Sequence, residues 1–298
     1  GNCAVLITTK DLQTGNTVSE EYLVLEQKVA ATPKEKKVLP EECYTIDGSF
    51  HLKLADGSEL ASAEPYTLLY RAPTDNDTDL TFRNLMKPWI QQTEQFESLA
   101  VTHPGVQNSF KLTNPKGKFH VTDSYVDTEK GILVTSELHC ESGRVFIPRF
   151  GKCFRLDESF DNVTYTGRAG ESYCDMKEQF PVREVSCTVK NMTEPNLRPQ
   201  ESGNRCDCTA ASFSNGKVKV TFRAVDKPFE LGVKPYTDQE LIGMKHREDE
   251  KRTGTYVTIQ AFQQGIGTGA CGPGIAPEYL YSSDRDYVLK FLITVEKL

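Results

Sequence analysis

The sequence predicts an all-β protein built as a large antiparallel β-sandwich, and three observations lead to this prediction. Short segments rich in β-branched and aromatic residues alternate in polarity with a period of two, as strands do. Turn dipeptides such as Asn215-Gly216 separate these segments at near-regular intervals. Helical patterns are few and do not alternate with the strands, which disfavours an α/β fold.

The individual elements follow from these patterns in chain order. Strands are predicted at residues 5–9, 22–25, 50–54, 66–70, 119–121, 132–138, 218–222, 256–261 and 287–295. Hairpin turns are predicted at Asp47-Gly48, Asp56-Gly57, Lys116-Gly117, Glu129-Lys130-Gly131 and Asn215-Gly216. A helical pattern over residues 81–96 contains Pro88, so any helix there is short or starts late. A second helix is predicted over residues 237–245, where Thr237 and Glu240 have the spacing of a capping box.

Two domains are expected in the 298 residues. Residues 1–37 hold two strands around the turn Gly15-Asn16, followed by a charged linker, and residues 38–298 are long enough to bury a large core. A pair of strands does not make an independent domain. We therefore expect residues 1–37 to complete a sheet of a partner or to pack on the large domain.

Charge and cysteine usage exclude several classes of function. The net charge of −7 argues against nucleic acid or an anionic membrane as a partner, and no apolar run approaches the roughly 18 residues of a membrane-spanning helix. The nine cysteines are odd in number and irregularly spaced, which favours reduced buried thiols over a disulfide framework. Cys206 and Cys208 would face one side of a strand, and no histidine lies at zinc-ligand spacing from them, so no metal site is predicted.

The most specific motif is residues 69–77, Leu-Tyr-Arg-Ala-Pro-Thr-Asp-Asn-Asp, which joins a strand-like end to a polar turn. Pro73 fixes its own φ and biases Ala72 toward an extended conformation. Asp75, Asn76 and Asp77 can then accept hydrogen bonds from local amides. Taken alone, these features indicate a well-capped turn.

As a whole, this run resembles the signature that opens the C-terminal β-sandwich domain, the small chain, of family-two β-galactosidases. Four further stretches, at residues 148–156, 160–175, 198–205 and 265–279, resemble motifs of the same family in the same order. The resemblance implies a sandwich like that of galactose mutarotases. Residues 15–25 also resemble the end of the immunoglobulin-like domain that precedes the small chain. The sequence departs from the family pattern at Met176, where an arginine is usual after Asp175.

The resemblance implies hydrolysis of terminal β-D-galactosides such as lactose by the complete enzyme. Such hydrolysis uses two carboxylates that flank the scissile bond. In this family both carboxylates belong to a separate (β/α)₈ barrel, so no catalytic residue is assigned here and the chain alone is expected to be inactive. Its implied work is to support the active site and the assembly. A stand-alone carbohydrate-binding module and an aldose-1-epimerase-like protein are the alternatives.

The resemblance also places candidate substrate-binding residues at a pocket rim. They are Cys271, Arg71, Asp75, Asn76, Asp77, Glu201, Asn204 and Arg205. Cys271 stands where some family members have a tryptophan that lines the galactoside pocket. The alternative interpretation of the charged residues is that they lock turns or form buried ion pairs that fix loops, and Arg149 shares this ambiguity.

Partners and cofactors are implied in the same way. The expected partners are a barrel domain or large subunit, a β-galactoside and further copies in a homo-oligomer. No cofactor is expected in this chain, and any Mg²⁺ or Na⁺ of the full enzyme would be held by the barrel. A bacterial cytoplasmic location is favoured, with a periplasmic or secreted one left open.

Overall fold

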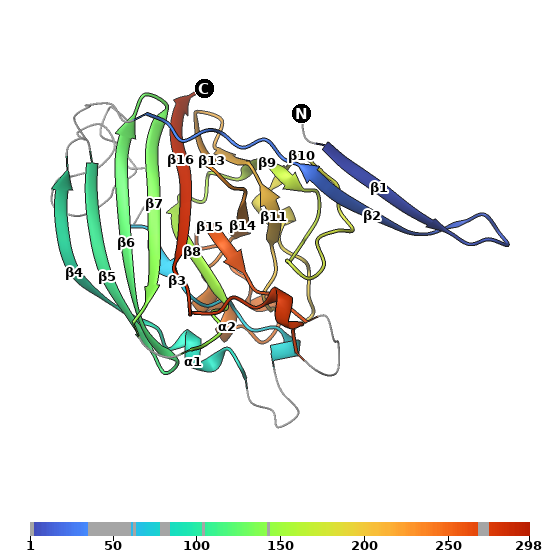
Figure 1. Ribbon diagram of the computed structural model, residues 1–298, viewed down its shortest axis with the longest axis horizontal. Helices are drawn as coiled ribbons and strands as arrows, with labels where there is room; N and C mark the ends of the chain where they lie inside the picture. The colour runs from blue at the N-terminus through green and yellow to red at the C-terminus, as the bar shows by residue number, and fades with distance from the viewer. Residues whose placement is uncertain are drawn as a thin grey trace.

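The computed structural model describes residues 3–34, 61, 64–77, 84–102, 105–141, 144–267 and 274–298. Two antiparallel sheets face each other, and a separate hairpin projects from one end (Figure 1). The larger sheet has nine strands in the order β10-β9-β12-β13-β16-β7-β6-β5-β4, and the smaller has five in the order β11-β14-β15-β8-β3. The predicted antiparallel β-sandwich is confirmed.

The elements have the following bounds. The nine-stranded sheet contains β4 Thr93–Thr102, β5 Gly105–Asn114, β6 Gly117–Thr128, β7 Gly131–Cys140, β9 Asn162–Arg168, β10 Val182–Thr188, β12 Ala210–Ser214, β13 Val218–Ala224 and β16 Tyr287–Lys297. The five-stranded sheet contains β3 Tyr66–Leu68, β8 Arg149–Leu156, β11 Asn204–Cys208, β14 Phe229–Lys234 and β15 Thr255–Gln263. The hairpin is formed by β1 Cys3–Lys10 and β2 Thr17–Glu26. The helices are α1 Lys87–Ile90 and α2 Asp238–Gly243, and short 3₁₀ turns lie at Asp75–Asp77, Val189–Met192, Arg247–Asp249 and Pro277–Tyr279.

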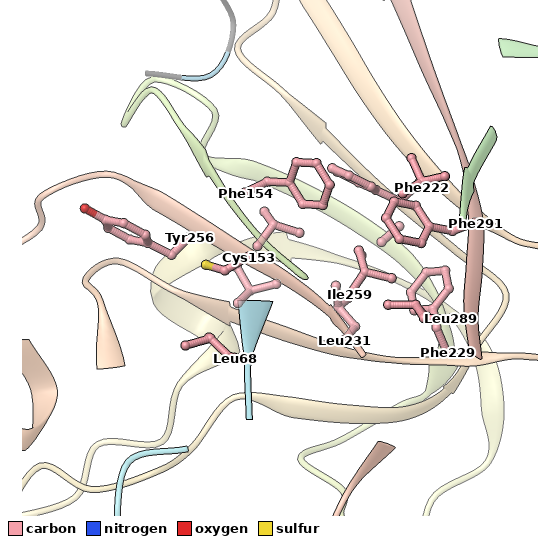
Figure 2. Packing of buried hydrophobic residues seen from close by; sticks show 14 of the residues in the cluster. Leu68, Cys153, Phe154, Phe222, Phe229, Leu231, Tyr256, Ile259, Leu289 and Phe291 are labelled. Atoms are coloured by element: carbon pink, nitrogen blue, oxygen red, sulfur yellow. The ribbon is translucent and has the colours of Figure 1, made fainter. Parts of the chain in front are cut away.

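The core lies between the two sheets and is rich in aromatic side chains. Figure 2 shows Phe154 of β8 facing Phe222 and Phe291 of the larger sheet, and its ring centroid lies 5.1 and 5.9 Å from theirs. Leu231 and Ile259 extend this layer from the neighbouring strands β14 and β15 (Figure 2). Tilted and edge-on rings at these distances are the favourable geometry for aromatic pairs, so the core fixes how the sheets face each other.

Every predicted strand that falls on described residues is confirmed, although the predicted segment 66–70 ends earlier, at Leu68. The predicted strand at residues 50–54 and the turns at 47–48 and 56–57 lie outside the described residues. Alternation did not reveal β8, because all of its residues except Arg155 are buried and its two faces do not differ in polarity.

The two helix predictions have different outcomes. Helix α2 is confirmed with its capping box, in which Thr237 and Glu240 each satisfy the other's backbone amide. The prediction of a helix over residues 81–96 is wrong for its described part except at Lys87–Ile90, because residues from Thr93 onward form β4. Pro88 lies in the first turn of this short helix, where its missing N–H costs nothing.

Among the described cysteines all are free thiols, and Cys206 and Cys208 are buried. The expectation that these two face one side of a strand is wrong. Asp207 between them has a positive φ of 55°, and the register of β11 with β14 shifts there, as in a β-bulge. Cys208 therefore joins the core, whereas Cys206 contacts Ser172.

The outer face of the five-stranded sheet is buried beneath loops and α2, and it carries polar side chains. Lys234 and Gln260 are buried on this face, next to strand residues Gly232 and Gly151. A Cβ atom at Gly151 would lie 2.9 Å from the Gln260 side chain, so glycine leaves the space that the buried polar layer occupies. In the described part of the chain, no helix is long and apolar enough to cross a membrane.

His120 of β6 contacts two glutamates, Glu97 and Glu141, near the surface, and these contacts can be tested by their effect on stability at different pH. Its hydrogen bond to Glu141 is the largest cause that raises the pKa of His120, and Glu97 contributes in the same direction from 2.9 Å. A raised histidine pKa stabilises the fold below the unfolded pKa, and this stabilisation is lost as pH rises through the folded pKa. We expect His120→Gln to lower the unfolding free energy by about 0.5 kcal/mol at pH 5.5 and by nothing at pH 9 in urea titrations. An equal loss at both pH values would contradict this explanation.

Candidate functional site

The turn within the motif of residues 69–77, which we call the signature turn, is locked by a buried ion pair. The Arg71 guanidinium donates to both carboxylate oxygens of Asp77, with Nη1–Oδ2 at 2.6 Å and Nη2–Oδ1 at 3.0 Å. Asp77 Oδ2 also accepts from the backbone N–H and the hydroxyl of Thr74, at 2.6 and 3.0 Å. Bidentate arginine–carboxylate pairs fix geometry as well as charge, so this pair sets the shape of the turn from within.

A second buried cluster lies on the outer face of the five-stranded sheet and joins four elements. Arg149 at the start of β8 donates to Glu201 at 2.8 Å, to Asp238 at 2.5 Å and to Gln263 at 2.7 Å. Lys234 at the end of β14 donates to both Glu201 and Asp238. We call these five residues the Arg149 cluster. Glu201 also accepts the backbone N–H of Ala72 at 3.0 Å, which ties the cluster to the signature turn.

The Arg149 cluster is balanced in charge, with two cations facing two carboxylates. Burial alone would lower the pKa of the Arg149 guanidinium, but the carboxylates of Asp238 and Glu201 raise it above its ordinary value. Burial alone would raise the pKa of Asp238, but Lys234 and Arg149 lower it below its ordinary value. Arg149 and Asp238 thus remain ionised, and the carboxylates of the cluster act as acceptors that hold loops together.

A third polar group lies beside this cluster, around Asn204 at the start of β11. The Asn204 amide donates to Ser172 O and to Glu230 Oε2, both at 2.8 Å, and accepts from the Gln260 amide at 2.8 Å. Burial is the largest cause that raises the pKa of Glu230 to about 7, against the opposing hydrogen bonds from Asn204 and the Gln263 N–H. Glu230 is therefore a carboxyl group that changes charge near neutral pH.

The remaining predicted rim residues divide between interior and surface. Arg205 is buried and donates to the Tyr165 hydroxyl and to Met192 O, at 3.1 Å each. Asp75 and Asn76 are exposed; the Asp75 carboxylate lies 3.6 Å from Arg198, and Asn76 donates to Ile266 O at 3.1 Å. Cys271 lies outside the described residues.

The structure brings two of the sequence motifs together at one surface cavity of about 50 Å³. The signature turn contributes Pro73 and Asp75 to its wall, the 198–205 motif contributes Arg198 and Gln200, and Met244 follows from the end of α2. Gln200 accepts the backbone N–H of Asp75 at 3.0 Å, which joins the two motifs directly. Arg71, Asp77 and Glu201 are buried, and the hydrogen bonds given above for these residues all go to protein groups.

Sequence reasoning missed three members of the Arg149 cluster: Lys234, Asp238 and Gln263. The Thr237–Glu240 capping box was a signal for Asp238, because it places Asp238 in the first turn of α2. Nothing in the local sequence pairs Lys234 or Gln263 with Arg149. Strand pairing brings Gln263 opposite Arg149, and Lys234 joins the cluster through Glu201 and Asp238.

Comparison with known proteins shows the family. Residues 45–293 match the family model described as "Beta galactosidase small chain". The chain therefore belongs to the β-galactosidase small chain family. Among curated proteins it is 26% identical to a β-galactosidase of Staphylococcus xylosus over 98% of this chain and 31% of that protein. It is 27% identical to a β-galactosidase of Priestia megaterium over 94% of this chain and 30% of that protein. The chain thus spans less than a third of the length of these relatives.

Among solved structures, the chain is similar to a galactose mutarotase-like protein from Lactobacillus casei. The TM-score is 0.49 at 9% sequence identity, over 98% of this chain and 100% of that one. The fold assignment rests on the two antiparallel sheets described above.

Proposed function

We propose that this chain is a non-catalytic sandwich domain of a β-galactosidase, which walls and braces a sugar pocket whose reacting carboxylates lie in a barrel domain or subunit. The observation that carries the proposal is the Arg149 cluster together with the Arg71–Asp77 pair. The Arg71–Asp77 pair, Arg149 and Glu201 come from the motifs that resemble the family, and their charged groups pair inside the protein and hold loops in place. Family membership supports the enzyme class, and β-galactosides such as lactose are the substrates that the relatives' names suggest.

Complementation tests this proposal. The purified chain alone is expected to leave nitrophenyl β-galactoside intact, and addition of the barrel-bearing partner is expected to give turnover well above that of the partner alone. Cleavage by the chain alone would overturn the proposal. Millimolar or tighter binding of lactose in calorimetry would favour a carbohydrate-binding module instead, and faster anomer equilibration in polarimetry would favour an epimerase.

We also propose that the hairpin β1–β2 completes a sheet of a neighbouring immunoglobulin-like domain. One of its faces carries Val5, Ile7, Leu23 and Leu25, all exposed. A two-stranded unit gains little stability alone, so a covering sheet accounts for these aliphatic side chains. The hairpin extends away from the sandwich (Figure 1), which leaves room for such a domain.

Arg168 at the end of β9 holds this hairpin to the sandwich. Its buried guanidinium donates to Tyr22 O at 2.9 Å, to Glu178 at 2.7 Å and to Asp207 at 2.7 Å. The Tyr22 N–H in turn donates to Glu178 O at 2.6 Å. One side chain therefore connects β2 with the loop between β9 and β10 and with strand β11.

Loss of Arg168 is expected to release the hairpin. Arg168→Leu should expose the segment after β2, so that trypsin cleaves at Lys28 or Lys34 at least about tenfold faster than in the wild type, because local opening governs such cleavage. The control is Arg183→Leu, which changes an exposed arginine of β10. Equal cleavage rates for the two variants would contradict the assigned role of Arg168.

A further inference from the structure

A second cavity, of about 10 Å³, lies beside the Arg149 cluster. Its wall includes three members of that cluster, Arg149, Lys234 and Asp238. The rest of the wall comes from β3, β8, β14, β15 and the segment that leads into α2. Every wall residue is buried except Tyr66 and Thr237, which are partly buried. Anything that occupies this cavity is therefore largely shielded from bulk solvent.

The two cations on the wall have hydrogen-bond donors to spare. A guanidinium group carries five N–H donors and an ammonium group carries three. Among the described residues, Arg149 donates one hydrogen bond from Nε, one from Nη1 and two from Nη2, which leaves one Nη1 hydrogen. Lys234 donates to Glu201 and Asp238, which leaves one hydrogen on Nζ.

Acceptors are also present on the wall. Asp238 Oδ1 accepts from Lys234 and Oδ2 accepts from Arg149, and each carboxylate oxygen has the capacity for another hydrogen bond. Tyr66 and Thr258 line the same cavity, and each carries a hydroxyl group. The wall thus offers both donors and acceptors, as a group that does both requires.

Volume and charge together identify the occupant. A cavity needs roughly 10–15 Å³ to hold one water molecule, so this cavity admits a single non-hydrogen atom and excludes a sugar. The Arg149 cluster has two cations and two carboxylates, so it has no net charge to offset the cost of burying a small ion. Water fits the volume, is neutral, and both donates and accepts.

We propose that this cavity binds one ordered water molecule as a member of the Arg149 cluster. The water accepts from Arg149 Nη1 and Lys234 Nζ and donates to Asp238, so it joins β8, β14 and α2 through hydrogen bonds that the direct contacts leave unmade. Buried waters typically make about three hydrogen bonds and are costly to remove. The inference is independent of the enzyme class, so its failure would leave the proposed function standing.

The first test is a high-resolution crystal structure of the wild-type chain. We expect one density peak at about 2.7–3.2 Å from both Arg149 Nη1 and Lys234 Nζ. A crystal soaked in bromide should show no anomalous peak at this position. A wild-type map without the density peak would overturn the inference, and so would bromide at the site, because it would identify the occupant as an anion.

Gly232→Ala extends the test to solution. Gly232 lines the cavity, and a Cβ atom there would lie 3.3 Å from Gln260 Nε2 and 3.5 Å from Thr258 Cβ, with only side-chain atoms among its nearest neighbours. The methyl group therefore enters the cavity once the Gln260 side chain moves by a few tenths of an ångström. We expect ¹⁷O magnetic relaxation dispersion to count one long-lived water fewer in Gly232→Ala than in the wild type.

Gly243→Ala is the matched control, because nothing lies within 4 Å of a Cβ atom there, and it should keep the wild-type count of long-lived waters. An unchanged count in a folded Gly232→Ala variant would contradict the inference. The crystallographic test uses the wild type, so it decides the matter even if Gly232→Ala does not fold.

Discussion

Replacement of Arg149 by methionine is expected to destabilise the fold by about 4 kcal/mol, because it leaves two buried carboxylates with a single cation and so one negative charge uncompensated. Arg149 is almost fully buried and neutralises Glu201 and Asp238 together with Lys234. Methionine preserves much of the volume and removes the charge, so Lys234 alone faces two carboxylates. The measurement is the unfolding free energy from urea titration at pH 7.

Two further variants separate charge from packing in this result. Arg149→Lys keeps the charge but loses the planar fork that serves Glu201, Asp238 and Gln263 at once, and we expect a loss of about 2 kcal/mol. Arg144→Met removes an exposed arginine that is paired with Asp284 and should cost less than about 1 kcal/mol. An Arg149→Met variant as stable as Arg144→Met would show that the cluster contributes nothing to the fold.

The stability of the Arg149 cluster bears on the proposed bracing role because Glu201 also holds the signature turn. Its Oε2 accepts the Ala72 N–H, one residue after the Arg71 that pairs with Asp77. A substitution in β8 or α2 that displaces Glu201 is therefore expected to displace Asp75 and Asn76 on the surface as well. Through this connection two motifs more than a hundred residues apart contribute to one surface, which is what the proposed bracing role requires.

The sequence was sufficient for the fold class and for the motifs, and insufficient for the pairings inside the site. Period-two alternation revealed β6 and β16, which are buried on one side, whereas β8 is buried on both sides and has no alternation to detect. A buried arginine–glutamate pair was one of two open interpretations of Glu201. Only the tertiary structure shows that its partners are Arg149 and Lys234.

The helix prediction over residues 81–96 failed for the opposite reason, because a local pattern was present but did not decide the structure. Local pattern favoured a helix, yet β4 pairs with β5 over its whole length, from Thr93 with Thr113 to Thr102 with Gly105. Long-range backbone hydrogen bonds thus outweighed a weak local preference. The capping box of α2 succeeded because both of its hydrogen bonds are local and need no tertiary partner.

Glu230→Gln is expected to be more stable than the wild type at pH 8 by about 2 kcal/mol and equal to it near pH 5. Burial raises the folded pKa of Glu230 to about 7, above the value of an exposed glutamate. Between these two pKa values the folded state holds a proton that the unfolded state has lost, so the wild type loses stability as pH rises through this window. Glutamine mimics the protonated form, and its oxygen can accept from Asn204 as the carboxyl does.

The comparison is made by urea unfolding of wild type and variant from pH 5 to pH 8, with Glu137→Gln as the control. Glu137 is exposed on β7, so plots of unfolding free energy against pH should run parallel for wild type and Glu137→Gln. Parallel curves for Glu230→Gln as well would mean that Glu230 has an ordinary carboxyl pKa. If the unfolding free energies of wild type and Glu230→Gln instead become equal as the pH falls to 5, the polar layer on the outer face of the five-stranded sheet holds the Glu230 carboxyl group neutral at pH 6, beside the backbone N–H of Gln263.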